Sequence, residues 1–271
     1  FQIDYYGSQP TPYWASRPYL SHAFLGQQRP STERVENNGY STADFGALDP
    51  ALQQACVVRE ALLALSGVQG AMIKCTAATT TTTSSSSSGK GGQGSATAKR
   101  VLHFSVDSDA CSDRSLTAQV EQMLPICEHA VAVRDFIRVH SRQSYGLVSH
   151  ALASSIKLIF REFDVLVAQL EFQLKSGKLS MQRLVYLLQP SARVLKLLAQ
   201  LASRVWDQRG GELLDSLHDI LLEQGEVKAK QLLLHLFSKA MEPFLDMIRT
   251  WIFAGELHDN YAEFMIKVDR S

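Results

Sequence analysis

The segment that most resembles a ligand-binding motif is a glycine-rich run at residues 89–94. Gly89, Gly91 and Gly94 match the pattern G-x-G-x-x-G, in which N–H groups at the start of a helix bind a dinucleotide phosphate. That chemistry needs a strand before the glycines and a helix after them. Here a run of Thr and Ser precedes the pattern, so we interpret it as a coincidence within a linker and expect no bound cofactor.

The histidines and cysteines lack the spacing of a metal site. Cys127 and His129 are two residues apart, so they cannot share one face of a helix, and His218 directly precedes Asp219. His150 lies among apolar positions of a helical pattern, where we expect a packed, hydrogen-bonded histidine. The sequence therefore predicts no bound metal. Its four cysteines have no metal-ligand or disulfide-framework spacing, and we interpret them as free thiols of a reducing compartment: Cys56, Cys75, Cys111 and Cys127.

Charge and motifs limit the class of function. The 27 basic and 27 acidic residues balance, whereas nucleic-acid and membrane surfaces normally require a basic excess. No G-x-S-x-G, H-E-x-x-H or phosphate-loop pattern occurs, and paired carboxylates such as Glu162 and Asp164 are interpreted as helix-surface charges. We therefore expect no nucleic-acid or membrane partner and no catalytic residues, and we predict that the protein is not an enzyme.

The chain divides into four segments. Residues 1–48 are rich in Pro, Gly, Ser and Asn, which predicts an extended linker, although an aromatic and apolar cluster within 13–25 suggests that it docks on its own domain or on a partner. Residues 49–75 start the helical domain, because Asp49-Pro50 is a helix start and Gly67 a stop. Residues 76–98 are mostly Thr, Ser and Gly and are predicted to be disordered. Residues 99–271 are predicted to form a helical bundle.

Apolar residues in the second half recur in steps of three and four, which is typical of amphipathic helices. Two short helices are predicted on either side of Pro125, and longer ones over 145–174, 179–206 with a kink at Pro190, 213–222 and 227–253. The connections between the predicted helices are short, and the sequence contains no repeat of fixed length. The predicted fold class is all-α, an irregular bundle or stack of long antiparallel helices. One face of the longest helix should be buried: Leu152, Ile156, Ile159, Phe163, Leu166 and Leu170.

Several segments in the second half of the chain resemble one family in their residues, their order and their spacing. They are Tyr145-Gly146-Leu147-Val148-Ser149-His150-Ala151-Leu152, Val167-Ala168-Gln169-Leu170-Glu171, Leu188-Gln189-Pro190, Gly210-Gly211-Glu212-Leu213-Leu214, Trp251-Ile252-Phe253-Ala254-Gly255-Glu256-Leu257 and Asp259-Asn260-Tyr261-Ala262-Glu263-Phe264-Met265. Together they resemble the N-terminal GRIP region of gamma-tubulin complex proteins. Asn260 and Phe244 depart from the Pro and Tyr usual in the family. The resemblance implies structural motif positions at Tyr145, Gly146, His150, Ala151, Leu152, Gln169, Leu170, Glu171, Gln189, Pro190, Trp251, Gly255, Tyr261, Glu263 and Phe264.

The resemblance implies a function in assembly. In the family, the N-terminal helical half packs laterally against neighbouring gamma-tubulin complex proteins, and the C-terminal half grips gamma-tubulin. We therefore expect a scaffold that supports microtubule nucleation, with component 3 and other gamma-tubulin complex proteins as lateral partners. Gamma-tubulin would be bound only through the C-terminal half, which this chain stops short of. The expected location is the cytoplasm and cytoskeleton, at a microtubule-organising centre such as the centrosome or spindle pole. The alternative is a generic helical adaptor that binds a partner helix or peptide.

Overall fold

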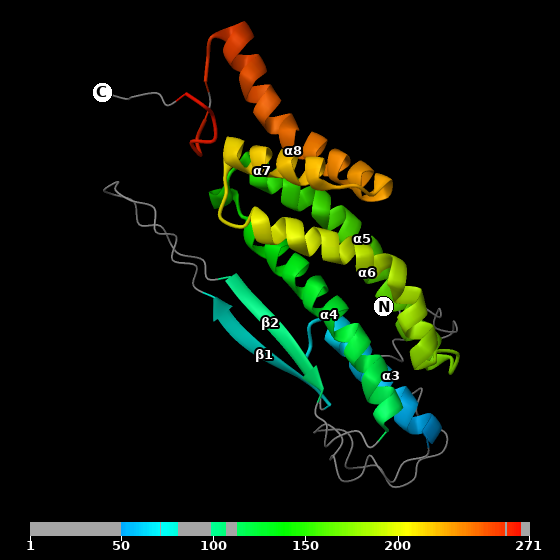
Figure 1. The fold of residues 1–271 in the computed structure, drawn as a ribbon. Helices are drawn as coiled ribbons and strands as arrows, with labels where there is room; N and C mark the ends of the chain where they lie inside the picture. Colours follow the sequence, from blue (N-terminus) through cyan, green and yellow to red (C-terminus); the bar gives the residue numbers. More distant parts are fainter. Residues whose placement is uncertain (1–49, 71, 81–98, 107–112, 258, 267–271) are drawn as a thin grey trace, which may run out of the picture. The chain divides into compact units, whose positions relative to one another are not determined.

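The computed structural model describes residues 50–70, 72–80, 99–106, 113–257 and 259–266. Helices dominate this part of the chain, so the predicted all-α class is confirmed in its main feature (Figure 1). The predicted linker of residues 1–48, the glycine pattern that begins at Gly89, and Cys111 lie outside the described residues. The elements are α3 (Pro50–Leu65), β1 (Ile73–Thr80), β2 (Lys99–Val106), α4 (Arg114–His140), the 3-10 turn η2 (Gln143–Tyr145), α5 (Leu147–Lys175), α6 (Met181–Arg204), α7 (Gly210–Glu223) and α8 (Val227–Ala254).

Five of the six α-helices that the structure describes lie close to their predicted positions, because their boundaries carry local signals. α3 is followed by Gly67 at a φ of +79°, α6 begins at Ser180, whose side chain accepts a hydrogen bond from the Arg183 N–H, and α8 ends at Gly255 in the left-handed conformation. α7 starts at Gly210 rather than after the glycine pair.

The two short helices predicted around Pro125 are wrong, because α4 runs unbroken through that residue. Proline removes one N–H donor and crowds the preceding turn. Burial of an apolar face that continues across Pro125 outweighs this local cost. That face comprises Val120, Met123, Ile126, Cys127 and Ala130.

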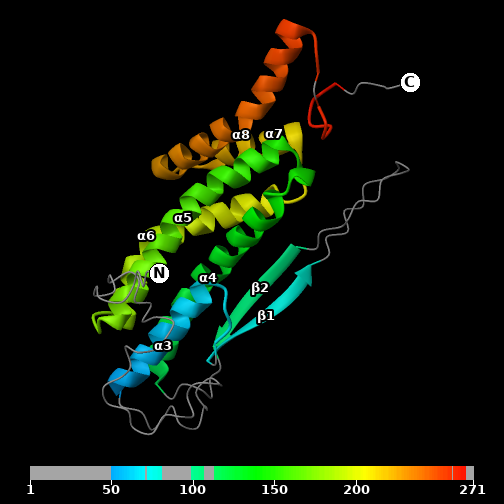
Figure 2. The ribbon, with the colours of Figure 1, turned by 180° about the vertical axis from the view of Figure 1, so that it is seen from behind.

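A two-stranded antiparallel sheet corrects both the predicted disorder of residues 76–80 and the predicted helical state of residues 99–106. Cys75 of β1 pairs with Phe104 of β2. The Phe104 side chain is buried, and its N–H donates to the Glu128 carboxylate of α4 at 3.2 Å. Both views place the strands alongside α4 (Figures 1 and 2). The Thr and Val residues favour strand once α4 provides an apolar surface to cover.

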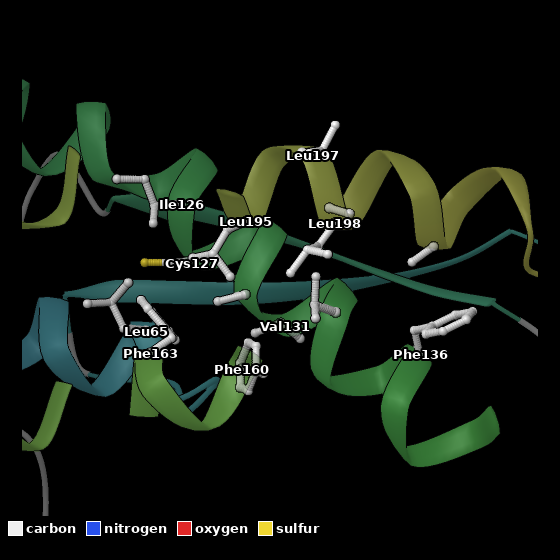
Figure 3. Close-up of a cluster of buried hydrophobic side chains, with 14 of the residues drawn as sticks. Leu65, Ile126, Cys127, Val131, Phe136, Phe160, Phe163, Leu195, Leu197 and Leu198 are labelled. Carbon is white, nitrogen blue, oxygen red and sulfur yellow. The ribbon is translucent and has the colours of Figure 1, made fainter. Parts of the chain in front are cut away.

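The core lies where α4, α5 and α6 meet. α4 packs against α6, and α5 packs against α8. Figure 3 shows the side chains that converge there: Val131 and Cys127 of α4, Phe160 and Phe163 of α5, and Leu195 and Leu198 of α6. Cys75 and Cys127 are free thiols, as predicted. Burial raises the pKa of the Cys127 thiol to about 12.

The predicted face of α5 is largely correct. Leu152, Ile156, Phe163 and Leu170 are buried, while Ile159 and Leu166 are half-buried. His150 is exposed, so the prediction that it packs against neighbours is wrong. Two residues along a helix correspond to about 200° of rotation, which places His150 opposite the buried Leu152.

Among the described helices, none is long and apolar enough to cross a bilayer.

Truncation of Phe163 tests the packing of this core. The side chain is buried in the core (Figure 3), so Phe163→Ala should lower the free energy of unfolding by about 3–5 kcal/mol. Urea denaturation followed by circular dichroism measures the change. Leu158→Ala, at a position of α5 that is 63% exposed, is the control and should cost much less. Equal effects of the two substitutions would contradict the assignment of the buried face.

Candidate functional site at the junction of three motif segments

The segment after α8 is a turn built around one carboxylate. The Asp259 side chain accepts hydrogen bonds from the N–H groups of Tyr261 at 3.1 Å, Glu263 at 3.1 Å and Phe264 at 2.8 Å. Partial burial acts to raise the pKa of Asp259, but these N–H groups outweigh it and hold the pKa below its ordinary value. The turn also holds Ala262 at a φ of +54°. Asp259 therefore fixes the direction in which Glu263 points.

Glu263 reaches the start of α5. Its carboxylate accepts hydrogen bonds from the N–H groups of Leu147 at 2.7 Å and Val148 at 3.2 Å. The N-cap position of α5 is Gly146, which provides no side-chain cap. A carboxylate pairs well with the unsatisfied N–H groups and positive dipole end of a helix. Glu263 thus caps α5 from 116 residues away in the sequence.

Two glycines leave the space that Glu263 occupies. A Cβ at Gly146 would lie 2.2 Å from a Glu263 carboxylate oxygen, and a Cβ at Gly210 would lie 2.6 Å from the Glu263 carbonyl oxygen. Both glycines also have positive φ angles, +98° and +52°, which side chains disfavour. We call the group of Gly146, Leu147, Gly210, Glu263 and Phe264 the motif junction.

Phe264 attaches the motif junction to α8. Its side chain is buried, and its ring centroid lies 5.9 Å from those of both Phe244 and Trp251. Such aromatic pairs contribute beyond the area they bury. The chain can return to these residues because Gly255 ends α8 in the left-handed region. The motif junction therefore links the ends of α5, α7 and α8.

Burial shifts the protonation of Glu263. Removal from water raises the pKa of its carboxyl, whereas the N–H groups of Leu147 and Val148 act in the opposite direction. The carboxylate is committed to the helix cap. Within the described ranges, no group of three or more His, Cys, Asp or Glu side chains is placed to hold a metal ion.

A buried histidine lies next to the motif junction, and sequence reasoning missed it. His140, at the end of α4, is fully buried, with Nδ1 3.1 Å from the Phe136 carbonyl oxygen and Nε2 3.0 Å from the Trp206 carbonyl oxygen. Its ring stacks on Phe136 at 4.0 Å and lies 4.8 Å from Tyr145. His140 thus connects α4 to the turn between α6 and α7. Only its helical spacing from Phe136 could have indicated the contact.

The remaining motif positions lie elsewhere and do not form a common site. Leu152 and Leu170 are buried in the core, and Ala151 is half-buried. Glu171 pairs with Lys175 at 2.7 Å on the surface of α5. Other motif positions are exposed or half-buried without a role in the motif junction: His150, Gln169, Gln189, Pro190 and Tyr261. The structure brings together Tyr145, Gly146, Trp251, Glu263 and Phe264.

The three segments that meet at the motif junction are among the pieces of sequence that resemble one family. A family model described as Gamma tubulin complex component N-terminal matches residues 58–271. The chain belongs to the gamma-tubulin complex component family. The motif junction is therefore a structural feature of this member, built from the residues that carry the family resemblance.

Individual members show the same relationship. Gamma-tubulin complex component 2 of Mus musculus is 32% identical over 260 residues, covering 94% of this chain and 26% of that protein. Gamma-tubulin complex component 2 of Arabidopsis thaliana is 27% identical over 273 residues, covering 96% of this chain and 38% of that protein. Gamma-tubulin complex component 3 of Homo sapiens is 30% identical over 139 residues, covering 47% of this chain and 15% of that protein. The chain thus spans well under half the length of these relatives.

Component 2 relatives align with more of this chain than component 3 does, in agreement with the residues of two motif pieces. We interpret His150-Ala151-Leu152 and Gln169-Leu170-Glu171 as closer to component 2 than to component 3. The component 2 relatives align over 94% and 96% of this chain, against 47% for component 3. The similarity is therefore to component 2 over nearly the whole chain.

Replacement of Gly146 by Ala tests the space that Glu263 needs. Gly177→Ala is the matched control, because Gly177 also has a positive φ, +67°, but has no atoms within 4 Å of its Cβ position. Both variants should lose about 1 kcal/mol from backbone strain, and Gly146→Ala should lose more because of the collision with Glu263. Urea denaturation gives the difference. The double variant Gly146→Ala/Glu263→Ala should lose less unfolding free energy than the sum of the losses of the two single variants. Equal losses for the two glycine variants would argue against the cap.

The pH dependence of stability tests His140. Burial lowers the pKa of its imidazole, and hydrogen bonds to the Trp206 and Phe136 carbonyl groups oppose the shift, as does Asp207, whereas Arg209 adds to it. The folded state therefore binds a proton less readily than the unfolded state, and the stability that results is lost as the pH falls below about 6.5. The difference in unfolding free energy between wild type and His140→Gln should shrink between pH 7.5 and pH 5.5. His150→Gln, on the surface, is the control; a constant His140→Gln difference would refute the interpretation.

Proposed function

We propose that this chain is a structural scaffold component of the gamma-tubulin complex, supporting microtubule nucleation through lateral contacts with neighbouring gamma-tubulin complex proteins. Component 3 is the first of these neighbours, and a microtubule-organising centre such as the centrosome or spindle pole is the place of action. The observation that carries the proposal is the family match over residues 58–271, together with the motif junction that fixes the ends of three helices. Contact with gamma-tubulin is left to other parts of full-length family members.

The entropy of assembly favours a preformed scaffold for microtubule nucleation. A microtubule seed forms readily only if several gamma-tubulin molecules are held at a fixed spacing. Stiff helical units that meet side by side reduce the entropy lost when such an array is assembled. Catalysis is not needed for this role, and the Glu263 carboxylate is committed to capping α5.

One observation favours the second candidate function, a helical adaptor that binds a partner helix or peptide. A groove of about 1230 Å³ is lined by α5, α6 and the beginning of α8, with Phe163, Leu197 and Leu232 among its apolar residues. Arg193 and Glu226 also line it. The family match covers more of the chain than this groove, so assembly remains the first proposal.

Separate binding experiments with component 3 and with gamma-tubulin test the proposed function. The purified chain should bind the N-terminal region of component 3 saturably at micromolar concentration and should not bind isolated gamma-tubulin. Sedimentation velocity measures both. Saturable binding to gamma-tubulin would contradict the proposal, as would failure to bind component 3 when both proteins are folded.

A further inference from the structure

The outer edge of β1 carries backbone groups that the pairing with β2 does not use. The Phe104 N–H of β2 donates to the Glu128 carboxylate of α4 at 3.2 Å, so it points away from β1. Phe104 lies opposite Cys75 in the antiparallel register. The two residues therefore form one of the pairs that exchange no hydrogen bonds, in which the N–H and C=O groups of both residues point outward. The backbone of Cys75 is directed away from β2.

The same direction recurs at every second residue of β1. The register continues without a bulge along the whole strand, so the N–H and C=O groups of Ala77 and Thr79 lie on the same side as those of Cys75. At the start of the strand, the Ile73 C=O accepts a hydrogen bond from the Gly70 N–H at 3.2 Å. The unused groups therefore begin at Cys75. We call the backbone of Cys75, Ala77 and Thr79 the open edge.

The position of the open edge and its chemistry select an extended ligand. In both views β2 lies between β1 and α4, so β1 forms the outer side of the sheet (Figures 1 and 2). The side chains of Lys74 and Thr76, on either side of Cys75, are exposed. The N–H and C=O groups of a strand edge pair with those of another extended chain, whereas a helix has already paired its own groups internally. The fitting ligand is a peptide segment in the strand conformation.

The charges of the hairpin indicate which kind of extended segment fits. The two strands contain Lys74, Lys99 and Arg100 and no Asp or Glu. On the other side of the sheet, Glu128 of α4 contacts His103 of β2. An acidic segment therefore meets complementary charge at β1, whereas the β1 strand of a second copy would bring like charge. Lysine on an edge strand is also a common means by which sheets avoid pairing with copies of themselves.

We propose that the open edge of β1 binds an extended acidic segment of another protein, which adds a third strand to the sheet. Main-chain hydrogen bonds to Cys75, Ala77 and Thr79 hold the segment, and its Asp or Glu side chains lie beside the basic residues of the hairpin. This surface is separate from the motif junction, and the proposal does not rest on the lateral function proposed above.

Hydrogen exchange of single amides, measured by NMR on the full chain, tests the open edge. The probe is a peptide of about eight alternating Thr and Glu residues with blocked ends, within the usual length of a strand. In the free chain the Thr76 and Ala78 N–H groups, which point toward β2, should exchange slowly, and those of Cys75 and Ala77 should exchange fast. Saturating probe should slow the exchange of Cys75 and Ala77 by more than about tenfold and leave the other two amides unchanged.

A proline substitution removes one donor of the open edge. Ala77→Pro deletes an N–H that points away from β2, and proline is tolerated on edge strands at such positions. The matched control is Ala77→Val, which keeps the N–H and favours a strand. Fluorescence anisotropy with labelled probe should show a loss of about tenfold in affinity for Ala77→Pro and a change within about twofold for Ala77→Val. Circular dichroism and the unfolding midpoint check that both variants fold.

Two altered probes keep the test decisive if Ala77→Pro does not fold. N-methylation of every second residue removes the N–H groups along one edge of the peptide, so the probe methylated on the edge that faces β1 should lose binding. Replacement of Glu by Lys should weaken binding by more than about tenfold and reverse its dependence on salt. Unchanged affinity of both N-methylated forms would overturn the strand pairing, and equal affinity of the acidic and basic probes would overturn the acidic ligand.

The free chain provides the last outcomes. Slow exchange of the Cys75 and Ala77 amides without probe would overturn the proposal in favour of a segment of the chain itself. Slow exchange that appears only at high chain concentration would overturn it in favour of a second copy. Each of these results leaves the binding to component 3 to be judged by its own titration, so failure of the open edge and failure of the lateral function are distinguishable.

Discussion

The Glu263 carboxylate at the N-terminus of α5 is the contact on which the arrangement of the last helices depends. α5 begins at Gly146, which has no side chain with which to pair the free N–H groups of the first turn. Leaving such groups unpaired in a buried position costs about as much as losing hydrogen bonds. Glu263 pairs two of them and at the same time lies against Gly210 at the start of α7. Glu263 thus sets the relative position of two helix starts, and Phe264, which follows it, links them to α8.

The residues around the Glu263 carboxylate hold it in position at the start of α5. Gly255 turns the chain back after α8, Asp259 holds the following turn with three N–H donors, and Ala262 adopts a positive φ angle. Backbone strain at Ala262 costs energy, and the hydrogen bonds of Asp259 and Glu263 offset it. Because Phe264 follows immediately and packs on Trp251 and Phe244, the turn is fixed at both ends.

Local patterns predicted most of the helices, and contacts between distant residues explain what they missed. The apolar steps of α5 and the end of α8 at Gly255 follow from nearby residues. The continuity of α4 at Pro125 and the strand at Thr76 depend on packing partners, which local propensity does not include. The same holds for the motif junction. The resemblance to the family identified Gly146, Glu263 and Phe264 as motif positions. Nothing in the spacing of these residues indicated that they are in contact. His140 was missed because its partner Trp206 lies 66 residues away.

The motif junction also fixes the direction of α8. Phe264 contacts Phe244 and Trp251 of that helix. The buried residues of α8 are Leu233, Leu236, Ala240 and Met247, and the helix packs on α5 and α7. Together these contacts restrict rotation of α8 about its axis, because both its buried face and its last turns are held. Capping α5 and orienting α8 are therefore two effects of the same set of contacts.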